Sequence, residues 1–240
     1  YRTRSVYTMP LKSSIGKVLG VLQIINAQNE NGDFIPFDSD AELFLSQFAA
    51  NAAQVLEHAY LTDEMVRRML MMAAFRDPKE TYLHVERVAR FSVEIYDKWA
   101  DNHHVPAQKK SAARDNIRIA AKFHDIGKVG ISDLILKKVF PRLTEDERAV
   151  MKGHTCIGAE LFLNGTSEAD KLSYSVALHH HERWDGGKEG YPGKIDLHDY
   201  TLGDAVPCAT PLKGEEIPLA ARIVAVGDVF DASSHKRSYK

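Results

Sequence analysis

The sequence predicts a mainly α-helical protein with a small β segment at its N-terminal side. Three observations support this fold class. From residue 77 onward apolar residues recur at helical spacing, residues 38–76 contain neither Gly nor Pro, and two short runs within residues 1–37 are rich in Val, Leu and Ile. With 240 residues, 44% hydrophobic and 27% charged, the chain has the length and composition of one large or two small folded domains.

The overall charge argues against two classes of partner. Lys and Arg total 31 against 33 Asp and Glu, a net charge of -2, so no general field gathers nucleic acid or an anionic membrane. The longest apolar runs are much shorter than the ~20 residues of a membrane helix. We therefore expect neither a nucleic-acid polymer nor a membrane as partner.

The cysteines and the N-terminus indicate where the protein works. Cys156 and Cys208 stand far apart, without the spacing of a disulfide scaffold or a CxxC motif, which favours a reducing compartment. We therefore expect a cytoplasmic protein. The chain begins at Tyr1 with no signal-like segment, so we also expect a piece of a longer protein.

Residues 1–37 are predicted to form β structure. Residues 5–11 and 17–26 are the two strand-like runs, separated by a turn that ends at Gly16. A pair of strands is not stable alone. These strands therefore either belong to a sheet that starts before the chain or pack on the segment that follows.

Residues 38–76 are predicted to form one long helix, with Asp38, Ser39 or Asp40 as its N-cap. Apolar and small residues follow one another at alternating spacings of three and four, which is a heptad seam. The seam consists of Leu45, Phe48, Ala52, Val55, Ala59, Thr62, Val66, Met69 and Ala73. The helix either packs on its own domain or forms a parallel coiled coil, which would make the protein a homodimer.

The rest of the chain is predicted to be helical. The predicted helices are residues 80–99, 107–123, 145–162, 168–182 and 219–230. Thr144 and Glu147 form a capping box at the start of the third helix, and Pro218 suits the first turn of the last. Residues 184–216 are rich in Gly, Pro and Asp and are predicted to form a long loop.

Acidic residues and histidines recur within these apolar helical segments, where a bare charge or imidazole is costly to bury. They lie in five segments and comprise Glu80 and His84, His124 and Asp125, His154, the run His179, His180 and His181, and Asp228. One such histidine alone is more often a hydrogen-bonded core residue. Five segments together favour a shared metal centre, and imidazole with carboxylate suits Fe, Mn or Zn. Five further histidines are expected at the surface: His58, His103, His104, His198 and His235.

Three short motifs resemble the HD-GYP domain family of HD-type metal phosphohydrolases. They are His-Asp-Ile-Gly-Lys at residues 124–128, His-His-Glu-Arg-Trp-Asp-Gly at 180–186 and Gly-Tyr-Pro at 190–192. Residues 213–223 and 228–232 also match, so the resemblance covers about residues 77–240. Residues 6–61 resemble the C-terminal half of a GAF sensory domain. The implied organisation is a partial α+β GAF-like domain at 1–37, a connecting helix at 38–76 and an HD-type helical domain at 77–240.

The resemblance implies a bacterial signalling enzyme that hydrolyses cyclic di-GMP to linear pGpG, GMP or both. Two or three divalent ions, Fe or Mn, would be held by Glu80, His84, His124, Asp125, His154, His180, His181 and Asp228. Asp125 would bridge two ions, and Glu80 would serve a third. Lys128, Arg237 and Lys240 would contact substrate phosphate, and Tyr191 would lie near the site. Without the resemblance, Arg237 and Lys240 would be interpreted as part of a solvated basic tail.

The chemistry of such a centre is coherent, because two close cations activate a water and hold phosphate oxygens, while Lys128 adds a positive charge for the developing transition state. Two departures from the family are evident: residues 187–189 lengthen the Gly-Tyr-Pro loop, and residues 194–211 are an insertion. Two alternatives therefore stay open. One is a weak enzyme that binds cyclic di-GMP and signals to a protein partner; the other is a phosphohydrolase for another cyclic dinucleotide.

Overall fold

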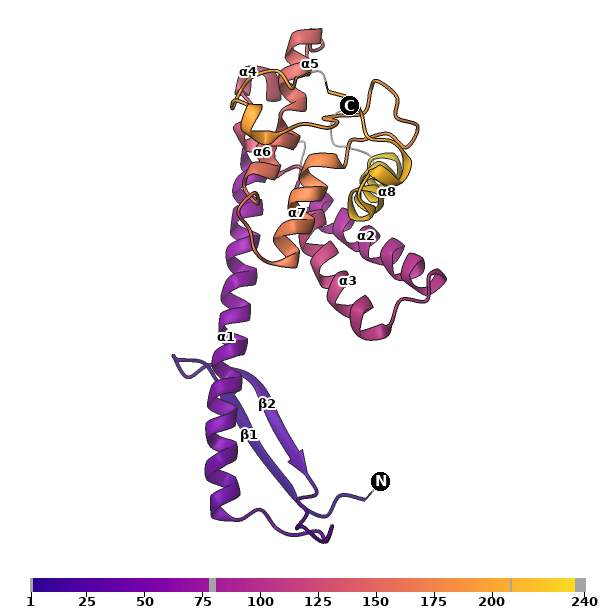
Figure 1. The fold of residues 1–240 in the computed structure, drawn as a ribbon. Helices are drawn as coiled ribbons and strands as arrows, with labels where there is room; N and C mark the ends of the chain where they lie inside the picture. The colour runs from indigo at the N-terminus through magenta and orange to yellow at the C-terminus, as the bar shows by residue number, and fades with distance from the viewer. Residues whose placement is uncertain (1, 78–80, 208, 236–240) are drawn as a thin grey trace. The chain divides into compact units, whose positions relative to one another are not determined.

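The computed structural model describes residues 2–77, 81–207 and 209–235. Contacts divide the chain into two compact units, Tyr1–Arg68 and Met69–Lys240. The long helix α1 (Ser39–Arg76) runs from the first unit into the second (Figure 1). Helices dominate the second unit, and the predicted mainly α fold class is confirmed.

The N-terminal unit is a β-hairpin packed on α1. Strands β1 (Val6–Lys12) and β2 (Val18–Ile25) pair in antiparallel register. Leu11 of β1 is buried with Ala49 and Ala53 of α1, and the turn is tied to the helix where the Ser14 hydroxyl donates to Glu57 at 2.8 Å. The strands therefore pack on the segment that follows, and a sheet that starts before the chain stays a prediction.

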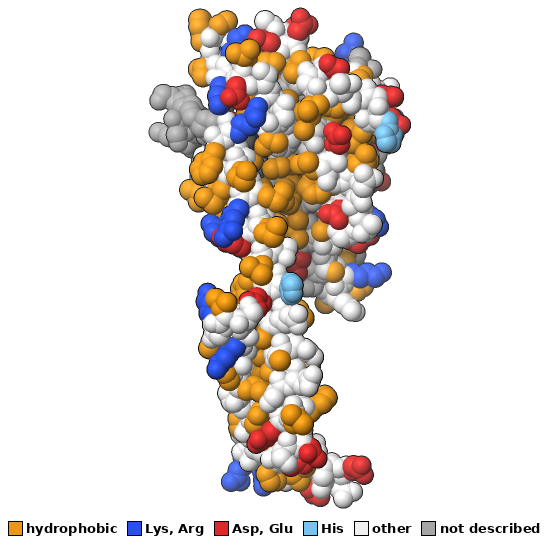
Figure 2. All heavy atoms as spheres, turned by 90° about the vertical axis from the view of Figure 1, so that its left-hand side faces the viewer, with side chains coloured by type: hydrophobic (Ala, Val, Ile, Leu, Met, Phe, Trp, Pro, Cys, Tyr) orange, Lys and Arg blue, Asp and Glu red, His pale blue; other side chains and the backbone are white. Residues whose placement is uncertain are grey.

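The predicted seam of α1 is divided between two environments. Leu45, Ala52 and Val66 are half-buried, whereas Phe48 and Val55 are exposed. Exposed apolar residues of α1 also include Phe44, Met65, Met69, Met72 and Phe75. Hydrophobic side chains are visible at the surface on the face drawn in Figure 2. Helix α1 therefore packs on its own domain with one side only, and the coiled coil stays a prediction.

The second unit is built mostly from short helices. They are α2 (Tyr82–Asn102), α3 (Ala107–Lys122), η1 (Ile126–Gly130), α4 (Asp133–Leu136), α5 (Glu145–Lys152), α6 (His154–Glu160), α7 (Glu168–His179), η2 (Leu197–Asp199), η3 (Gly214–Glu216) and α8 (Leu219–Ser234). Val88 of α2, Val176 of α7 and Val224 of α8 are fully buried in the main core cluster, with Ala120 of α3. This core fixes α2, α3, α7 and α8 against one another.

Local sequence signals predicted several helix ends well. The capping box of Thr144 and Glu147 starts α5 as expected, and α3 begins at residue 107. The single helix predicted over residues 145–162 is wrong, because the chain forms two helices with Gly153 between them. The Tyr200 hydroxyl packs so close to Gly153 that an added Cβ would lie 2.2 Å from it.

The predicted long loop is confirmed, interrupted only by η2 and η3 in its described part. The inserted residues 194–211 pack on α6 and α7, where Leu197 joins a core cluster with Cys156 and Leu178. Lys194 N donates to Thr210 O at 2.9 Å and closes the base of the insertion. Cys156 is a buried free thiol, and Cys208 lies outside the described residues. Among the described helices, none combines the length and apolarity that a membrane span requires.

Candidate metal centre

The fold brings the predicted ligands from five segments into two groups. Asp125, His154, His180 and His181 offer ligand atoms within 4.8 Å of one another, and so do His84, His124 and Asp228. They come from α2, the turn after α3, the start of α6, the end of α7, and α8. Glu80, Arg237 and Lys240 lie outside the described residues.

Three of these histidines share one local arrangement at the end of a helix. The last carbonyls of a helix have no partner within it, and each of these rings turns its Nδ1 to such a carbonyl. The distances are 2.8 Å from His124 to Ala121 O, 2.8 Å from His154 to Met151 O and 2.9 Å from His180 to Val176 O. A carbonyl only accepts, so Nδ1 carries the hydrogen. Nε2 then presents its lone pair to the site, as a metal ligand must.

His154 shows why the helix break matters. The sequence placed it in the middle of a helix, but α5 ends at Lys152 and α6 begins at His154. Because α5 ends at Lys152, the Met151 carbonyl is one of the last in that helix and accepts from the ring. The correction to the helix boundary therefore explains how His154 is oriented.

His84 is oriented differently because it lies in the first turn of α2. Its Nδ1 lies 2.7 Å from Asp231 Oδ2, and Arg87 donates to the same oxygen at 2.9 Å. Burial raises the pKa of Asp231, but Arg87 and His84 outweigh this effect and keep the pKa below its ordinary value. His84 Nε2 faces Asp228 Oδ1 at 3.4 Å. Sequence reasoning missed Asp231 and Arg87, although an Asp three residues after Asp228 on an apolar helix was a usable signal.

Asp125 lies at the centre of the histidine group. Its Oδ1 is 3.1 Å from His154 Nε2 and 3.6 Å from His180 Nε2, and it accepts no hydrogen bond from the described residues. Burial raises the pKa of Asp125, but Lys128 and His124 outweigh it and hold the pKa well below its usual range. A buried carboxylate oxygen that faces imidazole lone pairs is repulsive unless a cation lies among them. This arrangement therefore fits a metal ion.

Burial favours the neutral form of the two histidines that directly follow α7, His180 and His181. Burial lowers the pKa of His180, and burial with the neighbouring His180 and His154 lowers that of His181 further. Neutral imidazole is the form that binds metal. The His181 ring stacks on Tyr191 with centroids 4.8 Å apart. The structure thus places Tyr191 beside the predicted ligands.

The loop that carries Tyr191 is held by a buried carboxylate. Glu182 Oε1 accepts from Gly193 N at 2.6 Å, and Oε2 accepts from Leu212 N at 3.1 Å. These two bonds join both ends of the inserted segment to the end of α7. Glu182 lies within the motif at residues 180–186, and the motif alone does not indicate this structural role.

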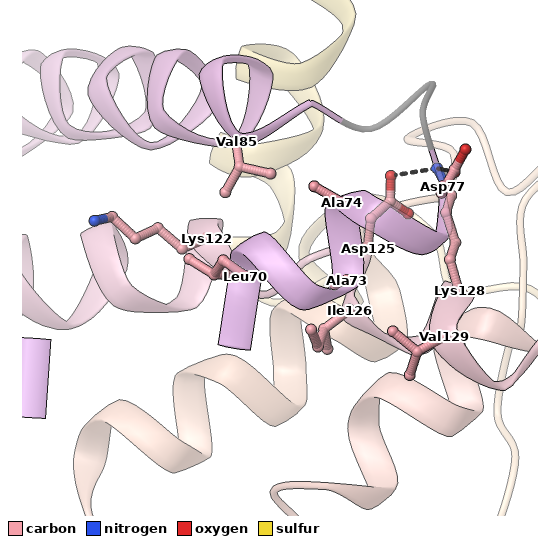
Figure 3. A pocket seen from close by; sticks show the side chains of 10 residues that line it. All are labelled: Leu70, Ala73, Ala74, Asp77, Val85, Lys122, Asp125, Ile126, Lys128 and Val129. Atoms are coloured by element: carbon pink, nitrogen blue, oxygen red, sulfur yellow. Dashed lines mark hydrogen bonds and ion pairs between the residues drawn. The ribbon is translucent and has the colours of Figure 1, made fainter. Parts of the chain in front are cut away.

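Lys128 lies three residues after Asp125, in η1. Its Nζ is 2.7 Å from Asp125 Oδ2 and 3.9 Å from Asp77 Oδ2 (Figure 3). The expected surface histidines are all exposed, namely His58, His103, His104, His198 and His235. His235 nevertheless lies 3.1 Å from Asp231 Oδ1 through its Nδ1.

These features define a helical domain with a buried cluster of imidazole and carboxylate groups, a donor set that suits Fe, Mn or Zn. The comparison with known families matches residues 81–233 to the HD domain. The chain belongs to the HD domain family. The GAF-like reading of residues 6–61 stays a prediction.

Three curated relatives extend the comparison. The chain is 37% identical to a cyclic di-GMP phosphodiesterase of Thermotoga maritima, over 74% of this chain and 40% of that protein. It is 42% identical to the cyclic di-GMP phosphodiesterase response regulator RpfG of Xanthomonas campestris, over 56% of this chain and 31% of that protein. It is 35% identical to the 3'3'-cGAMP-specific phosphodiesterase 2 of Vibrio cholerae, over 68% of this chain and 26% of that protein. The chain therefore spans well under half the length of these relatives.

Proposed function

We propose that this chain is a metal-dependent phosphodiesterase that hydrolyses cyclic di-GMP to linear pGpG, GMP or both. The observation that carries the proposal is the buried Asp125 carboxylate, surrounded by imidazole nitrogens and adjoined by the Lys128 ammonium. The names of the Thermotoga and Xanthomonas relatives support a cyclic dinucleotide as substrate.

Two or three divalent ions, Fe or Mn, would be held by the two ligand groups. Asp125, His154, His180 and His181 form one group, and His84, His124 and Asp228 form the other. His124 Nε2 lies 3.4 Å from Asp125 Oδ2, which supports Asp125 as the bridge between the groups. Glu80 would serve a third ion. Bound ions would lower the pKa of a water molecule and neutralise charge on the phosphate oxygens.

The chain's own residues prepare the site for an anionic phosphodiester. Helix-end carbonyls hold Nδ1 of His124, His154 and His180, and Asp231 lies against Nδ1 of His84, so these four rings direct their Nε2 atoms into the site. Lys128 would turn its ammonium from Asp125 to a phosphate oxygen, and Tyr191 would border the substrate. Arg237 and Lys240 would hold the second phosphate, the arginine by a bidentate fork.

The organisation around this site is part of the same proposal. Residues 1–37 would be the remainder of a GAF-like sensor, 38–76 a connecting helix, and 77–240 the catalytic domain in a cytoplasmic signalling protein. The exposed apolar residues of α1, such as Phe48, Val55 and Met69, support a homodimer through the connecting helix. A signalling protein partner would read the output if catalysis is weak.

A second candidate substrate is 3'3'-cGAMP, because the Vibrio cholerae relative is named as specific for it. Turnover of cyclic di-GMP and 3'3'-cGAMP should be compared under anaerobic conditions with Mn or Fe, and the products separated by chromatography. Asp125→Ala is the inactive control, in which metal content should also fall. Faster turnover of 3'3'-cGAMP would move the assignment to that substrate. Binding without turnover of either would favour the signalling module.

A further inference from the structure

The last turn of α1 is fixed onto the metal-binding unit. Leu70 is 4% exposed and lines a small pocket with Ala74 and Val85 (Figure 3). Arg76 donates to Ile131 O at 2.8 Å, just past the end of η1. The end of the connecting helix therefore has a defined position beside the segment that begins directly after Asp125.

Asp77 follows this last turn and is itself buried. Its side chain is 6% exposed, and its Oδ2 lies 3.9 Å from Lys128 Nζ. The same Nζ lies 2.7 Å from Asp125 Oδ2. Figure 3 shows Lys128 with both carboxylates, one a predicted metal ligand and the other at the end of the connecting helix.

The Lys128 ammonium group is thus attracted by two carboxylates, those of Asp125 and Asp77. At 3.9 Å in a mostly buried setting, the attraction of Asp77 for Lys128 is little screened by water. A phosphate oxygen that binds Lys128 has to compete with both carboxylates. The attraction of Asp77 falls as its distance from Lys128 grows, so displacement of Asp77 would leave more of the charge for phosphate.

We propose that Asp77 is a positioning residue through which the connecting helix restrains Lys128 and so sets the affinity of the site for a phosphate group. The inference rests on the proposed role of Lys128 in binding substrate phosphate. Asp77 directly follows α1, which ends at Arg76, so a displacement of the last turn of this helix would move Asp77. The Asp77–Lys128 contact would thus lower the affinity of Lys128 for phosphate, and displacement of Asp77 would raise that affinity.

The test measures binding of inorganic phosphate to the Mn-loaded protein by calorimetry. Asp77→Asn keeps the shape of the side chain and removes its charge, and should tighten phosphate binding about fivefold, since one opposing charge near Lys128 is lost. Asp77→Glu retains the charge and should bind as the original protein does. Asp133→Asn is the matched control, because Asp133 pairs with Arg76 at 3.3 Å on the same helix end and should leave the affinity unchanged.

Lys128→Met provides the background that separates positioning from a general structural effect. In a double-mutant cycle the effect of Asp77→Asn should vanish once Lys128 is removed. The proposal would be overturned by an unchanged phosphate affinity in Asp77→Asn, or by an equal change with and without Lys128→Met. A lack of phosphate binding by the original protein would overturn it as well. Turnover of cyclic di-GMP is measured on the same preparations. Its absence, with the Asp77 effect intact, would reject the proposed substrate and leave this inference standing.

Discussion

A single added methyl group at Gly127 should separate Asp125 from His154. Gly127 lies in η1, two residues after Asp125, and a Cβ on it would lie 1.9 Å from His154 O and 2.4 Å from Gly158 N. Both atoms are backbone of α6 and cannot turn away as a side chain would. Reaching even 3.0 Å from His154 O requires a shift of 3.0 − 1.9 = 1.1 Å between η1 and α6.

Gly127→Ala should therefore cost both stability and metal. Overpacking against a backbone lies at the upper end of the usual range, about 3 kcal/mol, which lowers Tm by about 6–12 °C in a domain of this size. A displacement of about 1 Å at Asp125 should reduce activity about 100-fold, with a loss of bound metal.

Calorimetry, elemental analysis and turnover on one preparation check this prediction for Gly127. Gly20→Ala is the control, because the same methyl group there meets only Leu11 Cδ1 at an ordinary 3.7 Å. If Gly127→Ala melts and binds metal as Gly20→Ala does, the close packing of η1 on α6 does not position Asp125.

Three further predictions follow from the site and from α1. Burial in the folded protein lowers the pKa of His180 and His181 below the ordinary 6.5, so the unfolded chain takes up protons first as pH falls. The Tm of the metal-free protein should therefore fall as pH drops below about 6.5. This fall should be less steep in His181→Gln. Glu80→Ala should lower the metal count by about one with the fold intact, because one carboxylate is lost; an unchanged elemental analysis would make Glu80 an outer partner of His84. Val55→Glu with Met69→Glu should favour monomer in light scattering, because both residues are exposed; a persistent dimer would count against the α1 seam.

Local signals explain which parts of the fold the sequence predicted well. The start of α5 at Glu145 depends on Thr144 and Glu147, which are neighbours in the chain, and the start of α3 follows Pro106 directly. Gly153, at the break, is instead packed against Tyr200 from a distant loop, whose hydroxyl would lie 2.2 Å from an added Cβ. Such a contact leaves no trace in the periodicity of residues 145–162.

The same distinction applies to the site. The candidate ligands can be predicted from the sequence because each polar residue stands in an apolar segment, as Asp228 does within α8. Asp231 was not singled out, because its partner His84 lies 147 residues away in the chain. Asp77 was missed for a similar reason, since its position at the end of a long helix says nothing of Lys128. Residues that orient or restrain other groups therefore emerge only from the tertiary structure.

The orientation of the histidines links the metal centre to the folding of the unit. His124, His154 and His180 each obtain their tautomer from the end of the helix that precedes them, so a local contact orients each of these rings. His84 lies at a helix start, where no such carbonyl is free, and depends on Asp231 of α8. The same helix supplies Asp228, which faces the other nitrogen of His84. Helix α8 therefore both orients His84 and supplies Asp228 to the second candidate ligand group, and a metal bound there would in turn hold α8 on α2.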